Sequence, residues 1–239
     1  MTFDVMMAAE RIWNYFMGKG LTACGCAGLI GNLYAESGLR PDNLQDTGNL
    51  RLFMSDEQYV KAVDSESYTE EQFANDKLGF GLAQWTWHTR KRALYRFAMF
   101  QDSSIGDLDT QIEFLYKELS ESYPRILSVL KSTESIAEAS DVVLTEFERP
   151  ANQSDSVKRK RAEHGQKFFD KLYKESDTMT EIVKDNTPDE WAKEAVDWAV
   201  KYKILYGDQN GDYKLRSNCT RQEMLIFLHR VYKLIKGIN

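Results

Sequence analysis

The apolar residues of the first 40 positions follow a helical spacing. Between residues 5 and 16 they recur every three or four positions, which predicts an amphipathic helix (Val5, Ala8, Ala9, Ile12, Trp13 and Phe16). Residues 23–35 form a near-continuous apolar run, which predicts a buried helix with Thr22 as its N-cap. Serine, glycine and proline within residues 37–41 end that helix. Every third position of its first half is a glycine, so another backbone can approach closely (Gly25, Gly28 and Gly31).

The middle of the chain is less regular. Residues 42–80 scatter Asn, Asp, Gly and Ser among short apolar pieces, and we expect a small β-hairpin or a long loop there. From residue 104 the helical spacing resumes, and the last helix of this part is predicted over about residues 156–173. The predicted fold class is mainly α, formally α+β, with a small hairpin region.

A polar segment divides the chain. Residues 174–187 carry no long apolar stripe, and we place a domain boundary there, near Asp177. The first domain is expected over residues 1–175 and the second, a small helical domain, over residues 181–239. Two capping-box patterns in the second part each precede an amphipathic stretch, and we expect a helix after each (residues 187–190 and 220–223).

Charge and composition exclude several classes of protein. The 239 residues carry a net charge of −6, and nucleic acid is not an expected partner. One basic run, residues 158–161, is expected to spread around a solvated helix. No apolar run is long enough to insert in a membrane, and the N-terminus has no pattern of a signal peptide. Three cysteines predict neither a disulfide framework nor a metal site, and we expect no cofactor (Cys24, Cys26 and Cys219).

Glu36 is the first candidate for chemistry. It stands where the buried helix of residues 23–35 breaks, so its carboxyl is expected half in a dry interior and half in an adjacent cleft. Desolvation there would raise the pKa of a glutamate, as a general acid near neutral pH requires. The alternative is a solvated surface glutamate.

A second motif, GFGLAQWT, spans residues 79–86. Its two glycines let a backbone approach a neighbour, Gln84 can orient an acetamido or hydroxyl group, and Trp85 or Trp87 can stack on a sugar face. The alternative is a tight turn into a core helix.

Together, the segment NLYAESGLRP (residues 32–41) and the second motif resemble the phage tail lysozyme family and, more distantly, soluble lytic transglycosylases. The similarity covers about residues 4–173, including SIGDLD (residues 104–109) and FERP (residues 147–150). The resemblance implies an α-rich pair of lobes with a small hairpin, and a peptidoglycan substrate. It makes Glu36 the general acid and Gln84 a residue of the cleft, and Tyr34 in the first segment is a further candidate for substrate binding.

The second carboxylate of a hydrolase is open at this point. Among the aspartates between the two motifs we consider Asp42, Asp46, Asp64 and Asp76, and we favour the last because it leads into the Gly79 turn. Without a second acid, the resemblance allows a transglycosylase route, in which Glu36 serves as acid and then as base and the sugar closes a 1,6-anhydro ring.

Residues 188–235 resemble a surface-layer homology module, with a Trp-Ala-x-x-Ala-Val start and a Thr-Arg-Gln-Glu cap. The resemblance implies binding to a secondary wall polymer of Gram-positive bacteria, for which Trp198 and Arg221 are the candidate contacts. The alternative for both is packing and capping. Such modules usually occur in threes, so the single copy here leads us to expect either one sufficient copy or a homo-oligomer. Lys174-Glu175 could be encoded by a ribosome-binding sequence, and an internal start at Met179 would then supply free copies of the second domain.

These features lead us to expect a phage endolysin, a muramidase-type glycosidase held in the host cytoplasm until lysis and then acting on the cell wall. The alternatives are a lytic transglycosylase, a tail-associated lysin, which the length of 239 residues disfavours, and an inactive wall-adhesion protein.

Overall fold

The computed structural model describes residues 2–174, 185–208, 211–217 and 219–237. The chain divides into two compact units, Met1–Ser176 and Asp177–Asn239. Both units are helical, and the described residues contain isolated β-bridges but no extended strand, which confirms the mainly α class. None of the described helices is both long and apolar enough to cross a membrane.

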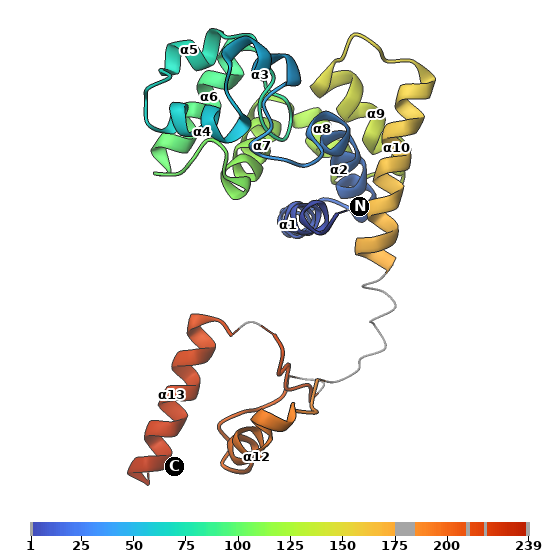
Figure 1. Ribbon diagram of the computed structural model, residues 1–239. Coiled ribbons are helices and arrows are strands. Elements are labelled where there is room, and N and C mark those ends of the chain that lie inside the picture. Colours follow the sequence, from blue (N-terminus) through green and yellow to red (C-terminus); the bar gives the residue numbers. More distant parts are fainter. Residues whose placement is uncertain (1, 175–184, 209–210, 218, 238–239) are drawn as a thin grey trace. The chain divides into compact units, whose positions relative to one another are not determined.

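The first unit is built around α2 (Ala23–Ser37), which is buried along most of its length. The Thr22 hydroxyl accepts a hydrogen bond from the Gly25 N–H at 2.9 Å, as the N-cap prediction requires. Figure 1 shows α2 between α1 (Phe3–Gly18), α9 (Ile136–Val142) and α10 (Asp155–Phe169).

The glycines of α2 allow these close contacts. A Cβ atom added to Gly31 would lie 2.5 Å from the Arg161 carbonyl oxygen of α10, and one added to Gly28 would lie 2.5 Å from the Ala139 Cβ of α9. The backbone of α10 therefore runs directly against α2, near the end that carries Glu36.

The expected hairpin at residues 42–80 is wrong, because this segment forms three short helices: α3 (Asp46–Leu52), α4 (Asp56–Asp64) and α5 (Glu70–Asn75). Full capping boxes at Ser55 and Thr69 satisfy the N-termini of α4 and α5 and favour helix over strand. What remains of the expected strand pairing is two isolated antiparallel bridges, Leu44 with Phe80 and Phe80 with Trp85.

The other helices complete two groups in the first unit. Figure 1 shows α3 to α6 gathered on one side and α2, α8, α9 and α10 on the other, with α7 between them. The remaining elements are α6 (His88–Phe100), α7 (Leu108–Ser122), α8 (Pro124–Leu130), the π-helix η1 (Val143–Glu148) and the π-helix η2 (Asp170–Lys174).

The second unit consists of a 3-10 turn, η3 (Glu190–Ala192), and two helices, α12 (Lys193–Lys201) and α13 (Arg221–Lys236). The capping box predicted at residues 220–223 is confirmed, since the Thr220 hydroxyl and the Glu223 side chain bond reciprocally to backbone N–H groups. The box predicted at residues 187–190 is wrong: the chain enters η3 at Asp189 without a side-chain cap, and Asp189 instead pairs with Arg216.

Candidate active site

Glu36 opens onto a pocket of about 290 Å³ in the first unit. Both sequence motifs contribute to it, together with residues from α6 and from the end of η1. The residues that line it are Glu36, Gln45, Gly79, Ala83, Gln84, Thr86, Trp87, Arg90, Glu148 and Pro150.

The end of α2 is fixed to the second motif. The Ser37 hydroxyl donates a hydrogen bond to the Leu82 carbonyl oxygen at 2.9 Å, and Gly38 ends the helix with a φ of 67°. This leaves the Glu36 side chain 20% exposed at the helix terminus, beside residues 79–87. Because α2 ends beside the second motif, and Ser37 bonds to a residue 45 positions later, the two segments share one pocket.

Arg161 of α10 forms an ion pair with Oε1 of Glu36. Its guanidinium also donates to Oδ1 of Asn32 at 3.2 Å, and the Asn32 amide is in turn held by the Ser140 hydroxyl at 3.0 Å. The expectation that residues 158–161 are solvated is wrong for Arg161, whose side chain is only 10% exposed. The close packing of α10 on Gly31 brings this residue to the carboxylate, and the basic run alone gives no sign of it.

Glu148 is the second carboxyl in the pocket. It is the last residue of η1, and its Oε1 is buried with no hydrogen-bond partner among the described residues. Burial and the nearby Glu36 raise the pKa of Glu148 well above its usual value, with Arg90 and Arg161 opposing that shift. The reasoning from sequence missed this residue, although the FERP segment at residues 147–150 was part of the resemblance.

Trp85 does not stack on a sugar, contrary to one of the two stacking predictions. Its side chain is fully buried, and its indole N–H donates to Oε2 of Glu118 at 3.0 Å. Glu118 also accepts two hydrogen bonds from Arg90, at 2.6 and 2.8 Å, and the Arg90 guanidinium lies 4.4 Å from the centre of the Phe147 ring. Trp85 therefore supports Arg90 from the core.

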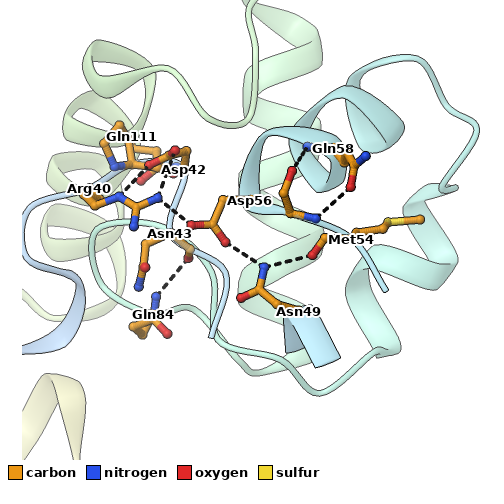
Figure 2. Close-up of polar contacts among 11 residues, drawn as sticks. Arg40, Asp42, Asn43, Asn49, Met54, Asp56, Gln58, Gln84 and Gln111 are labelled. Carbon is orange, nitrogen blue, oxygen red and sulfur yellow. Dashed lines mark hydrogen bonds and ion pairs between the residues drawn. The ribbon is translucent and has the colours of Figure 1, made fainter. Parts of the chain in front are cut away.

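Gln84 and Trp87 both line the pocket with Glu36. Gln84 has a φ of 45°, and its amide nitrogen donates to the Asn43 carbonyl oxygen at 3.1 Å (Figure 2). The same nitrogen donates to the Gly81 carbonyl oxygen at 3.2 Å. A Cβ atom on Gly79 would lie 2.5 Å from Oε1 of Gln84, so the first glycine of the motif makes room for this side chain. Trp87 is 72% exposed, just before α6.

The loop after α2 is held by a network of polar contacts, which Figure 2 shows. Arg40 pairs with Asp42 at 3.1 Å and with Asp56, and Asn49 bonds to Asp56 at 3.0 Å. Asp64 accepts hydrogen bonds from Ser104 and from the N–H of Ile105. Two of the four aspartates considered for the second carboxylate, Asp42 and Asp64, are therefore engaged outside the pocket.

Asp76, the favoured aspartate, is a core residue. Its carboxylate pairs with the fully buried Lys91 at 2.6 Å, accepts from the Tyr59 hydroxyl, and accepts from the Leu78 N–H at 2.9 Å. Burial lowers the pKa of Lys91 to about 8, against the opposing effect of Asp76. Asp76 lies outside the lining of the Glu36 pocket, so the geometry corrects the prediction that it is the second catalytic carboxylate.

Tyr34 lines a second pocket of about 460 Å³, and Arg161, the ion-pair partner of Glu36, lines that pocket as well. Its ring packs edge-on against His164 at 5.0 Å and Phe168 at 5.5 Å. A contact between Tyr34 and substrate remains a prediction.

In the second unit, Trp198 is 43% exposed and its ring lies 5.6 Å from that of Tyr202. Arg221 is an exposed residue at the start of α13. Binding of a wall polymer by either residue remains a prediction, and Met179, the predicted internal start, lies outside the described residues.

Comparison with known proteins covers the unit that holds this pocket. The family model of the phage tail lysozyme matches residues 7–172. Morphogenesis protein 1 of Bacillus phage B103 is 26% identical over 168 residues, which cover 67% of this chain and only 39% of that relative. Glu36, Gln84, Glu148 and Arg161 all fall within the matched region. The chain belongs to the phage tail lysozyme family.

Proposed function

We propose that this protein cleaves the glycan strands of bacterial peptidoglycan by general acid catalysis, with Glu36 as the acid. Membership of the phage tail lysozyme family implies a lysozyme-like glycosidase activity. The observation that carries the proposal is one pocket that combines the partly exposed Glu36 with a second carboxyl, an amide side chain and an exposed tryptophan (Glu148, Gln84 and Trp87).

Three of these groups, Glu36, Gln84 and Trp87, have a role in the proposed reaction. The Glu36 proton passes to the glycosidic oxygen as the bond to the anomeric carbon breaks, and positive charge develops on the sugar ring. Gln84 is proposed to orient a sugar substituent, and Trp87 to stack on a sugar face. Water then adds to the anomeric carbon, or the sugar's own 6-hydroxyl closes an anhydro ring in the transglycosylase route.

For the second unit we propose targeting to the cell wall. Aromatic residues are exposed on it, which supports stacking on a carbohydrate polymer (Trp191, Trp198, Tyr202 and Tyr206). Arg221 is proposed to contact anionic groups of a secondary wall polymer. Several copies of this unit, from a homo-oligomer or from fragments that begin at Met179, would strengthen binding to a repetitive wall.

Two biological roles are compatible with this chemistry. We propose an endolysin that stays in the host cytoplasm until lysis and then reaches the wall. The matched family is described as a tail lysozyme and the relative is named a morphogenesis protein, which favours a tail-associated lysin as the second candidate. Detection of the protein in purified virions would support the tail role, and its presence only in infected-cell lysate would support the endolysin role.

The first experiment identifies the fragments that the protein releases from purified Gram-positive peptidoglycan. We expect glycan fragments by mass spectrometry, and their ends separate the two routes: reducing sugars indicate hydrolysis and 1,6-anhydro sugars indicate transglycosylation. Glu36→Gln is expected to reduce release by about 100-fold or more while binding to walls is kept. Release at the wild-type rate by Glu36→Gln, or no glycan fragments from the wild type, would overturn the proposal.

A further inference from the structure

We propose that Glu148 is a positioning residue of the active site: Glu36 and Glu148 form a carboxyl pair that holds one proton between them at neutral pH. This assignment rests on the proposed function, because the pair acts on the glycosidic bond through Glu36. It replaces Asp76, which is engaged in the core, as the second carboxyl of the site.

The charges around Glu148 do not balance if every carboxyl is ionised. The charged groups that influence the pKa of Glu148 most are Glu36 of α2, Arg90 of α6, Arg161 of α10 and Glu118 of α7. Glu118 occupies Arg90 through two hydrogen bonds, and Glu36 occupies Arg161 through an ion pair. Two guanidinium groups thus serve three carboxyls, and Glu148 is the carboxyl without a dedicated cation.

The burial of Glu148 leads to the same conclusion. Its Oε1 makes no hydrogen bond within the described part of the chain and is shielded from solvent. Burial of a charged carboxylate oxygen without a hydrogen-bond donor costs more free energy than burial of the neutral carboxylic acid, so burial favours the protonated form. The raised pKa of Glu148 agrees with a proton held there in the free enzyme.

The local backbone directs this side chain into the pocket. The Arg149 N–H donates to the Leu144 carbonyl oxygen five residues earlier, at 2.9 Å, so η1 ends as a π-helix. Arg149 then adopts a left-handed φ of 51°, and Pro150 continues along the pocket wall. Single π-helical turns occur often at functional sites, because they displace a side chain from the regular helical position.

The pair can donate its proton and recover it within one catalytic cycle. In this cycle the proton held at Glu148 moves to Glu36, and Glu36 transfers it to the glycosidic oxygen, which also takes the electron pair of the broken bond. The water or 6-hydroxyl that then adds to the anomeric carbon returns one proton to the pair. The pair therefore begins and ends each turnover with a single proton.

The test compares Glu148→Gln with the wild type by the pH profile of glycan release from purified peptidoglycan. In Glu148→Gln the proton can be held only by Glu36, and the neighbouring Arg161 guanidinium favours the ionised form of Glu36. We expect the alkaline limb of the profile to move to lower pH by about one unit or more, and activity at pH 7 to fall by about 10-fold or more. Glu148→Asp, which keeps a carboxyl, is expected to restore part of the alkaline limb.

The matched control is Glu146→Gln, in the same π-helix, where Glu146 pairs at the surface with Arg125. Its pH profile is expected to match the wild type. An equal loss of activity at every pH in Glu148→Gln would make Glu148 a purely structural residue and overturn the proposal. An unchanged profile would overturn it as well, and in both cases an inactive Glu36→Gln would leave the proposed function intact.

A second readout does not depend on catalysis. A carboxyl with a raised pKa in the folded protein stabilises it fully below the pKa of the unfolded chain, and that contribution is lost as pH rises through the folded pKa. The free energy of unfolding of the wild type, relative to Glu148→Gln, is therefore expected to fall as pH rises from about 4 to 7. A difference that is constant with pH would contradict a proton held at Glu148.

Discussion

At the scale of single residues, two carboxyl groups with buried oxygens, those of Asp76 and Glu148, have opposite roles because their neighbours differ. Asp76 has an ammonium group, a hydroxyl and a backbone N–H as partners, so its charge is satisfied inside the core. The two guanidinium groups near Glu148 are already paired with Glu118 and Glu36, so a negative charge on Glu148 would have no cation of its own. The sequence shows the residue types but not these partners, which come from α2, α6, α7 and α10.

The role of Asp76 can be tested by Asp76→Asn. This change leaves Lys91 buried without its carboxylate, and we expect the free energy of unfolding to fall by about 3 kcal/mol or more. The fraction that remains folded is expected to release glycan fragments within a few-fold of the wild-type rate. Urea unfolding and initial rates at low temperature measure the two effects.

The control for Asp76→Asn removes both charges. The double variant Asp76→Asn with Lys91→Met is expected to recover part of the lost stability, since no unpaired ammonium remains. A rate loss of about 100-fold in a stably folded Asp76→Asn protein would instead restore Asp76 as a catalytic residue.

At the scale of elements, the helices with strong local signals were predictable and the short ones were missed. The apolar run of residues 23–35 and its Thr22 cap predict α2 within its observed bounds, Ala23–Ser37. Residues 42–80 were misjudged because α3, α4 and α5 are too short to show a hydrophobic period, although the Ser55 and Thr69 capping boxes are present in the sequence.

The site shows the same division between local and long-range information. Glu36 and Gln84 lie in segments that carry their own motifs, and both line the pocket. Glu148 reaches the pocket through the π-helical end of η1, and Arg161 reaches the Glu36 carboxylate through the packing of α10 on α2. Both arrangements depend on tertiary contacts. Spacing along the chain contains no signal for either.

Close packing of α2 and α10 predicts a large effect for Gly31→Ala. The added methyl group would lie 2.5 Å from the Arg161 carbonyl oxygen and 2.6 Å from the Gly165 nitrogen, so α10 has to move away. We expect a loss of about 1–3 kcal/mol of stability, together with reduced glycan release as Arg161 shifts from Glu36. Thermal unfolding and initial rates measure both.

Gly18→Ala is the matched control for that change. It lies at the end of α1, where an added Cβ has no other atom within 4 Å, and we expect no loss of stability. If Gly31→Ala and Gly18→Ala behave alike, close helix contact at Gly31 does not position Arg161.

At the scale of the whole molecule, the two units differ in the size of their apolar cores. The apolar cluster of the first unit runs from Ala8 to Phe168 and includes residues of all its major helices. In the described part of the second unit, Ile204 is the one buried apolar residue, and α12 and α13 contain none. The first unit therefore has an apolar core of its own, and we expect it to fold alone. The apolar residues exposed on α13 are consistent with the association of several copies proposed above.

This difference predicts the behaviour of a protein truncated after residue 176. The truncated chain keeps the whole apolar cluster and the Glu36 pocket, so it is expected to unfold at nearly the same temperature and to cleave soluble glycan fragments at the full-length rate. On intact cell walls it lacks the proposed wall-binding unit, and we expect its lytic rate to fall by at least about 10-fold, through the loss of avidity.

Sedimentation of each protein with purified walls separates binding from catalysis. If the truncated chain sediments with walls as well as the full-length protein does, the second unit is not the wall-binding part; if it fails to cleave soluble fragments although folded, the catalytic site requires residues beyond 176.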